Sequence, residues 1–248
     1  YGRYGYGMAV THEHREIDLR HTSFTHGPDI RGQMRFLDKE DAQKVFSPIL
    51  EKAWLEYPAM IRRDDLTWEA AITDQDGLRS RAPALFYAVY EVDGVATGYV
   101  MYRIRHGVTA GDATNSVQIH ELVASDDEAT AALWRFCFDI DLASTLTVGH
   151  GATTDDGLPW MLSDPRRLKR SSYDGLWLRL IDVPMALSAR TYSEDGSLVI
   201  RVEDSFCKWN DGKWRIDGGP KGAECASTNA QPDISMSADD LASIYMGG

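Results

Sequence analysis

The amino-terminal residues are the strongest candidates for chemistry in this sequence. They contain the pattern Tyr-x-x-x-Gly-[Phe/Tyr] at Tyr1, Gly5 and Tyr6. A phenol can supply a proton to a leaving group, so a tyrosine held in place by a tight turn could serve as a general acid. The same pattern also fits a simple turn whose aromatic rings pack on a sheet, and the spacing alone does not decide between the two.

Histidines, serines and cysteines are weaker candidates. His12 and His14 would share one face of a strand, where two metal ligands could lie, but no further pair of ligands recurs at a suitable spacing. We therefore expect a solvated strand face and no metal. A serine hydrolase would need the nucleophile elbow Gly-x-Ser-x-Gly, which the sequence does not contain. Cys207 and Cys225 fall in neighbouring predicted strands and are expected to be core thiols.

The composition is that of an acidic, folded protein. Of the 248 residues, 43% are hydrophobic and 26% are charged, which excludes a disordered, collagenous or membrane-spanning chain. Lys and Arg number 26 against 38 Asp and Glu, which gives a formal net charge of −12. Such a surface repels nucleic acid and attracts a cationic small molecule. No apolar run approaches the roughly 20 residues of a membrane span, and three cysteines are most simply the reduced thiols of a cytoplasmic protein.

Alternating and helical patterns follow one another along the chain. They predict a strand at the start of 8–26 and further strands at 33–37, 116–124, 145–149, 174–182, 197–204, 212–217 and 222–227. A hairpin is predicted over 84–106, with its turn at Asp93-Gly94. Helices are predicted after Asp38, at 64–73, at 126–141 and from Ser237 or Asp239 onward. This order predicts an α+β or α/β fold, with a helix laid on a mostly antiparallel sheet. The change in composition near 182–191 marks a candidate domain boundary.

The spacing of Tyr1, Gly5 and Tyr6 resembles the last motif of the GCN5-related N-acetyltransferases (the GNAT superfamily). In that superfamily the tyrosine often lies near the sulfur of coenzyme A and serves as general acid. The resemblance therefore implies the same role for Tyr1. The chemistry suits it, because amine attack on a thioester expels a thiolate that a nearby phenol can protonate.

Residues 31–175 repeat the order of elements of the same superfamily but lack its coenzyme loop. That pyrophosphate loop needs Arg or Gln followed by x-x-Gly-x-Gly or Ala at the start of a helix, and no such run occurs. At the helix where the coenzyme would dock, Ser125, Asp126 and Asp127 can cap the free N–H groups, and the carboxylates would repel a pyrophosphate. We therefore predict that this unit does not bind acetyl-CoA.

Longer runs of the chain are similar to the enhanced intracellular survival (Eis) family of acetyltransferases. These runs are Tyr1–Gly7, Ala131–Arg135, Asp174–Leu180, Val183–Arg190 and Asp240–Gly247. The family combines a catalytic GNAT domain, a degenerate central GNAT domain and a sterol-carrier-protein-like domain. The resemblance implies an α+β fold with a remnant of the catalytic domain at 1–30, a central GNAT-like mixed sheet with flanking helices at 31–182, and an incomplete sterol-carrier-like α/β domain at 183–248.

The Eis resemblance also implies an activity. Members transfer acetyl groups from acetyl-CoA to amines of cationic small molecules such as aminoglycosides, and they assemble as homo-oligomers, namely hexamers. Tyr1 is carried over as the catalytic residue. Asp174 falls where the family lines its acidic amine pocket, and Trp177 beside it either lines that pocket or belongs to the core. The acetyl-CoA is expected to be bound mainly by residues outside this chain.

Both ends of the sequence look like cuts through a longer protein. The chain opens on a turn-rich segment and closes on an apolar helix pattern. By resemblance, the coenzyme loop would precede Tyr1, and the terminal carboxylate that serves as base would follow Gly248. The printed chain alone is therefore expected to be inactive. The alternative is a non-catalytic scaffold, or a module that binds an apolar ligand in its sterol-carrier-like end.

Overall fold

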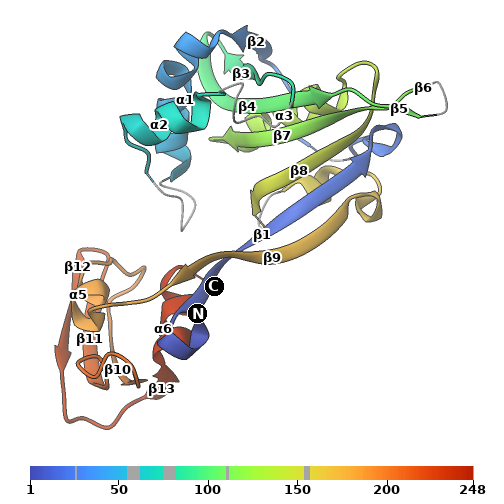
Figure 1. The fold of residues 1–248 in the computed structure, drawn as a ribbon. Coiled ribbons are helices and arrows are strands. Elements are labelled where there is room, and N and C mark those ends of the chain that lie inside the picture. Colours follow the sequence, from blue (N-terminus) through green and yellow to red (C-terminus); the bar gives the residue numbers. More distant parts are fainter. Residues whose placement is uncertain (26, 55–61, 75–81, 110–111, 154–156, 248) are drawn as a thin grey trace. The chain divides into compact units, whose positions relative to one another are not determined.

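The computed structural model describes residues 1–25, 27–54, 62–74, 82–109, 112–153 and 157–247 (Figure 1). Packing divides the chain into two compact units. One comprises Tyr1–Thr11 and Asp174–Gly248, and the other comprises His12–Tyr173. The amino-terminal motif therefore belongs to the same unit as the carboxy-terminal third of the chain. The domain boundaries inferred from the sequence stay a prediction.

A seven-stranded mixed sheet is the framework of the larger unit. Its strands lie in the order β2 (Gln33–Leu37), β3 (Phe86–Val92), β4 (Val95–Arg105), β7 (Asn115–Ala124), β8 (Ala143–Thr153), β1 (Gly7–Asp18) and β9 (Lys169–Leu178). Strands β7 and β8 run parallel, whereas the pairs from β2 to β7 and the pair β8–β1 are antiparallel. The predicted hairpin is confirmed, because β3 and β4 meet at Asp93 and Gly94 with φ of 51° and 77°, as a two-residue hairpin turn requires.

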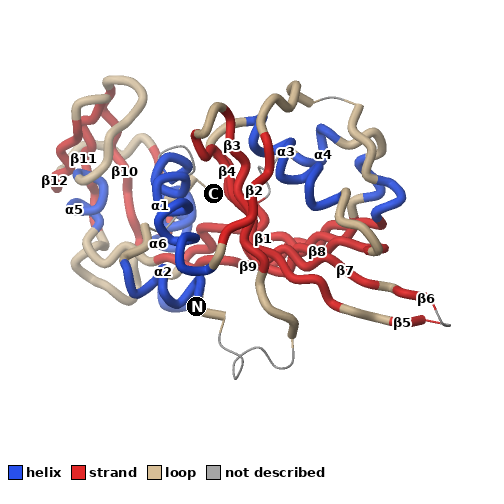
Figure 2. Tube along the Cα trace, turned by 90° about the horizontal axis from the view of Figure 1, so that it is seen from above, coloured by secondary structure: helices blue, strands red, loops and turns tan. Residues whose placement is uncertain are grey.

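Helices cover both faces of this sheet (Figure 2). They are α1 (Lys39–Trp54) and α2 (Asp65–Ile72) on one face and α3 (Asp127–Phe138) on the other. Successive strand residues point to opposite faces, so Val89 and Tyr99 pack with Phe46 of α1, while Ala88 and Val100 pack with Leu133 of α3. The helices predicted at 64–73 and 126–141 are confirmed. Shorter elements are η2 (Leu19–His21), α4 (Leu158–Met161), η4 (Pro165–Arg167) and the ribbon β5 (Val108–Thr109) and β6 (Asp112–Ala113).

A four-stranded sheet is the framework of the other unit. Its order is β12 (Gly222–Ser227), β11 (Gly212–Gly219), β10 (Gly196–Glu203) and β13 (Ile234–Ser237), and it is joined by η1 (Gly2–Tyr4), α5 (Val183–Ser188) and α6 (Ala238–Tyr245). Strands β10 and β13 are parallel and the remaining pairs are antiparallel. The predicted cap of the last helix is confirmed, since Ser237 and Asp240 form a capping box. Apolar side chains of this sheet and both helices share one core.

Two details differ from the sequence-based expectation. Strand β9 covers Lys169–Leu178 rather than 174–182. It is the edge strand of its sheet, and Lys169–Ser172 are exposed there, so its first half carries no apolar alternation. Cys207 lies outside the strands, in the segment after β10. The expectation of core thiols is nevertheless confirmed, because Cys137, Cys207 and Cys225 are all free and buried. Within the described residues, no helix is long and apolar enough to cross a membrane.

Candidate functional site

The amino-terminal motif folds into a closed turn. The Tyr4 N–H donates to the Tyr1 carbonyl at 2.9 Å, and the Gly5 N–H donates to the Gly2 carbonyl at 2.8 Å. Gly5 ends the turn in the left-handed conformation, with φ of 72°, which side chains other than glycine adopt at a cost. A Cβ at Gly5 would also lie 1.8 Å from Nη1 of Arg179. The turn itself and the arginine against it therefore require this glycine.

The turn brings Tyr1 onto the end of β9. The Tyr1 ring stacks on Trp177 with centroids 5.7 Å apart and 27° between the ring planes, and it meets the Tyr6 ring edge-on at 6.0 Å. The Trp177 indole Nε1–H donates to Oδ2 of Asp174 at 2.7 Å. The structure thus brings together Tyr1, Asp174 and Trp177, the residues for which the sequence predicted site roles.

This cluster is open to solvent and carries a negative charge. Tyr1 is 77% exposed, and the Asp174 side chain is exposed as well. The hydrogen bond from Trp177 lowers the pKa of Asp174, so its carboxyl group stays ionised at neutral pH. A carboxylate attracts an ammonium group, and the faces of tyrosine and tryptophan bind cations. The arrangement therefore suits a cationic ligand that approaches Tyr1.

Arg179 and Asp204, the residues that fix the backbone of this turn, were not identified from the sequence. The Arg179 side chain is only 3% exposed, donates through Nη2 to Oδ2 of Asp204 at 2.6 Å, and donates through Nη1 to the Tyr4 carbonyl. One feature of the sequence could have identified Arg179. Arg179 stands between Leu178 and Leu180 in an apolar run, and a buried charge needs a partner. The sequence did not identify that partner.

The N-terminus of α3, where the coenzyme would dock, is occupied by the chain's own side chains. Asp126 accepts the Ala129 N–H at 2.8 Å, which confirms the predicted cap. Glu128 in the first turn accepts Arg31 at 2.6 Å and the Tyr90 hydroxyl at 2.6 Å. The hydrogen bonds from Arg31 and Tyr90 lower the pKa of Glu128 to about 2, so it is charged at neutral pH. Carboxylates here disfavour a pyrophosphate. That this unit does not bind acetyl-CoA stays a prediction.

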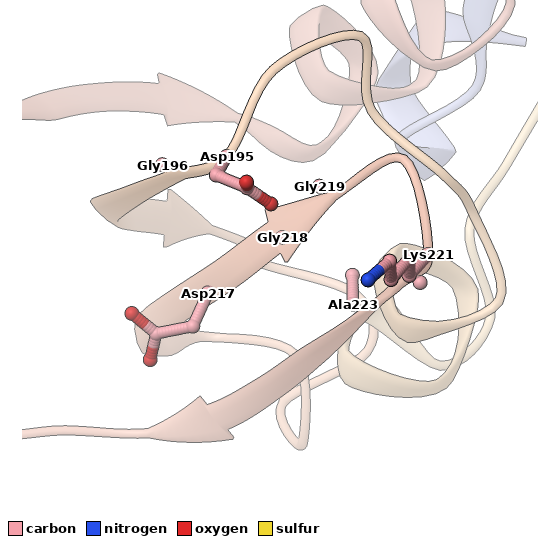
Figure 3. Close-up of a pocket in the computed structure, with 8 residues that line it drawn as sticks. Asp195, Gly196, Asp217, Gly218, Gly219, Lys221 and Ala223 are labelled. Atoms are coloured by element: carbon pink, nitrogen blue, oxygen red, sulfur yellow. The ribbon is translucent and has the colours of Figure 1, made fainter.

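A separate hollow lies at the turn between β11 and β12 (Figure 3). Glycines, Asp195, Asp217 and Lys221 line it, with Ala223. Figure 3 shows the Asp195 carboxylate directed toward Gly218 and Gly219, and a Cβ at Gly219 would lie 1.9 Å from Oδ1 of Asp195. The glycines therefore let the Asp195 loop approach β11. Apart from Ala223, the residues that line the hollow are glycines and charged residues.

His12 and His14, which were considered as metal ligands from the sequence and not favoured, lie on β1. In the part of the chain that the structure describes, no group of three His, Cys, Asp or Glu side chains is placed to hold a metal ion. His12 instead meets the Tyr173 ring edge-on, with centroids 5.9 Å apart.

Comparison with known families defines the class of protein. The family model of the acetyltransferase (GNAT) domain matches residues 59–180, and that of the sterol carrier protein domain matches residues 183–248. The chain therefore combines a GNAT acetyltransferase domain with a sterol-carrier-like domain. This confirms the predicted α+β fold, with a GNAT-like mixed sheet followed by a sterol-carrier-like domain.

Individual relatives match this chain over its whole length. An uncharacterized N-acetyltransferase of Streptomyces coelicolor is 34% identical over 251 residues, which are 100% of this chain and 60% of the relative. The N-acetyltransferase Eis of Mycobacterium tuberculosis is 29% identical over 259 residues, covering 100% of this chain and 59% of that protein. The chain is thus a homologue of the Eis-family N-acetyltransferases, as its sequence motifs predicted, and it spans about 60% of the length of the curated relatives it matches.

Solved structures agree with this assignment. The crystal structure of Eis1 from Mycobacterium abscessus has a TM-score of 0.80 and 28% identity, and the match covers 100% of this chain and 60% of that one. A GCN5-related N-acetyltransferase from Anabaena variabilis has a TM-score of 0.82 at 18% identity, again over 100% and 60% of the two chains. At that identity the likeness concerns the fold alone.

Proposed function

We propose that this chain is part of an acetyl-CoA-dependent N-acetyltransferase that acetylates amine groups of a cationic small molecule such as an aminoglycoside. The observation that carries the proposal is the cluster in which Tyr1 stacks on Trp177 while the Trp177 indole holds Asp174. The net charge of −12 supports a cationic acceptor. The names of the relatives support transfer of an acetyl group to nitrogen.

In this proposal Tyr1 is the general acid. The acceptor nitrogen attacks the carbonyl carbon of the thioester, the carbon–sulfur bond breaks, and the sulfur takes its proton from the Tyr1 phenol. The Asp174 carboxylate attracts the cationic acceptor, and the Trp177 face packs against it. The base that removes the amine proton is proposed to lie in the part of the full-length protein outside this sequence.

Acetyl-CoA is proposed to bind mainly to residues outside this sequence. The N-terminus of α3 supports this, because Asp126 already caps one of its N–H groups and its first turn carries the carboxylates of Asp127 and Glu128. On this proposal the chain alone is inactive, and the complete protein works in the cytoplasm as a homo-oligomer, a hexamer by resemblance. These features are proposals that follow from the Eis resemblance.

The alternative function, a module that binds an apolar ligand, requires a different structure around the four-stranded sheet. A module for an apolar ligand needs an apolar cavity beside that sheet. In the described part of this unit, side chains pack there with one another: Leu180, Val183, Leu187, Ile200, Val202, Cys225, Ala238, Leu241 and Ala242. This packing supports the acetyltransferase proposal over the carrier alternative.

The test uses the full-length protein with acetyl-CoA and kanamycin, and it follows the release of free coenzyme A thiol. Tyr1→Phe removes only the hydroxyl, so kcat should fall by about 100-fold or more, the usual worth of a general acid. Tyr6→Phe is the matched control, since Tyr6 belongs to the same aromatic cluster and has no proton to give in this scheme. An unchanged kcat in Tyr1→Phe would refute the assigned role.

A further inference from the structure

A buried guanidinium connects the turn that carries Tyr1 to the sterol-carrier-like domain. The Arg179 side chain is 3% exposed and the Asp204 side chain 1%. One end of the guanidinium donates to Oδ2 of Asp204 at 2.6 Å, and the other donates to the carbonyl of Tyr4. A single side chain therefore fixes the backbone of the turn against a buried carboxylate.

Asp204 is itself fixed by its surroundings. Its Oδ1 accepts the N–H groups of Phe206 at 3.0 Å and Cys207 at 2.8 Å. Asn210, which is fully buried, donates to the carbonyls of Leu180 and Ile181 at 3.1 and 3.2 Å. Although burial raises the pKa of Asp204, the hydrogen bonds from Arg179, Cys207 and Phe206 hold it below its ordinary value. The carboxylate therefore stays charged and in place.

The turn is held at two points by residues at the end of β9. Trp177 is the last residue but one of that strand, and Arg179 follows directly after its last residue, Leu178. Trp177 contacts the ring of Tyr1, and Arg179 contacts the carbonyl of Tyr4. Gly5 allows the second contact, because a Cβ there would meet the guanidinium at 1.8 Å. The Tyr4 ring adds a third contact, edge-on to Phe206 at 5.5 Å.

We propose that Arg179 is a positioning residue for acetyl transfer, through which the sterol-carrier-like domain sets the place of the Tyr1 hydroxyl. The inference rests on the proposed role of Tyr1 and goes beyond it, because it gives the carboxy-terminal domain a part in the rate of the reaction. A general acid must lie within hydrogen-bonding reach of the leaving group. A displacement of about 1 Å in such a group can cost up to 100-fold in rate.

The test is a double-mutant cycle on the full-length enzyme with acetyl-CoA and kanamycin. Arg179→Lys keeps a positive charge for Asp204 but lacks the planar fork that reaches two acceptors at once. We expect kcat to fall about 10-fold through misplacement of Tyr1, with KM for both substrates changed less than twofold. In the Tyr1→Phe background, the same Arg179→Lys change should have no further effect on kcat, because the proton it positions is gone.

Arg201→Lys is the matched control. Arg201 pairs with Asp211 at 2.5 Å and donates to the carbonyls of Val202 and Gly212. Like Arg179 it bonds a carboxylate and backbone carbonyls of the same unit, but its side chain is only half-buried and its hydrogen bonds go to β10, β11 and their connection. Its kcat should equal that of the unaltered enzyme.

Gly5→Ala keeps the experiment decisive if Arg179→Lys does not fold. It keeps both residues of the buried Arg179–Asp204 pair, but it places a Cβ against Nη1 of Arg179 and so disturbs the contact between arginine and turn from the side of the turn. It should lower kcat in the same way, and again only when Tyr1 is present. If either change slows Tyr1→Phe as much as it slows the unaltered enzyme, the positioning role is wrong while the role of Tyr1 stands. If Tyr1→Phe itself keeps full kcat, the proposed function fails and this inference fails with it.

Discussion

The charge of Asp174 can be removed without removing its hydrogen bond. Asp174→Asn keeps a side-chain oxygen that can accept the Trp177 indole N–H, which the carboxylate now accepts at 2.7 Å. Asp174→Leu loses both the charge and the acceptor. If Asp174 attracts a cationic amine, the first change should weaken binding of the acceptor while the ring of Trp177 stays oriented under Tyr1.

The expected size of the change in acceptor binding follows from the exposure of Asp174 to solvent. Two unit charges 4 Å apart attract by about 1 kcal/mol in bulk water and about 4 kcal/mol near a protein surface. Because Asp174 and Tyr1 are both exposed, the attraction should lie near the bulk-water end of this range. We therefore expect a rise of about 5- to 30-fold in KM for the amine. The kcat should stay the same, because this contact is made equally before and during the reaction.

Steady-state kinetics of the full-length enzyme with kanamycin and acetyl-CoA provide the assay, at low salt and again near 1 M NaCl. High salt shortens the screening length to about 3 Å, so the difference between the unaltered enzyme and Asp174→Asn should shrink. The KM for acetyl-CoA should not change. If KM for kanamycin is the same in Asp174→Asn at low salt, Asp174 does not bind the acceptor. A fall in kcat alone would also refute this reasoning.

Three further predictions concern the fold. Asp126→Ala removes the cap of α3 and should lower the free energy of unfolding by about 1 kcal/mol, measured by urea denaturation. Asp204 has a pKa below its ordinary 3.8 in the folded state. Its carboxylate therefore stabilises the fold fully above pH 3.8, and this stabilisation is lost as the pH falls through the folded pKa. Between about pH 6 and 3, the melting temperature of Asp204→Asn should fall less than that of the unaltered protein. Cys137, Cys207 and Cys225 are buried, and burial raises the pKa of Cys137 and that of Cys225 to about 11. Iodoacetamide at about pH 8 should therefore label the three thiols only after denaturation, as mass spectrometry of the peptides would show.

Local signals in the sequence predicted much of the fold. The turn at Asp93-Gly94 and the cap at Asp126 each depend on a few neighbouring residues, and both are confirmed. The start of β9 was not found, because Lys169–Ser172 lie exposed on an edge strand and show no apolar alternation. An edge strand is defined by its pairing with a distant strand, and that pairing leaves little trace in its own residues.

The residues of the candidate site were chosen for a different reason. Tyr1, Asp174 and Trp177 were singled out by resemblance to a family, and nothing in their spacing shows that they meet. The partnership of Arg179 with Asp204 was not predicted at all. An arginine in an apolar run indicates that a buried partner exists. Which of the many carboxylates in the sequence supplies it is decided only when the chain folds.

The glycines of the opening run show how closely the turn depends on the carboxy-terminal part of the chain. A Cβ at Gly5 would meet Arg179, and a Cβ at Gly7 would lie 2.0 Å from the Asp239 carbonyl and 2.7 Å from the Ser243 nitrogen in α6. These glycines therefore serve close packing rather than a phosphate, which agrees with the absence of a following helix N-terminus. Since packing places Tyr1–Thr11 with Asp174–Gly248, a change in α6 or in the Arg179–Asp204 pair should displace the turn that carries Tyr1. If Tyr1 has its proposed role, the sterol-carrier-like domain acts on the rate in this way without binding any ligand of its own.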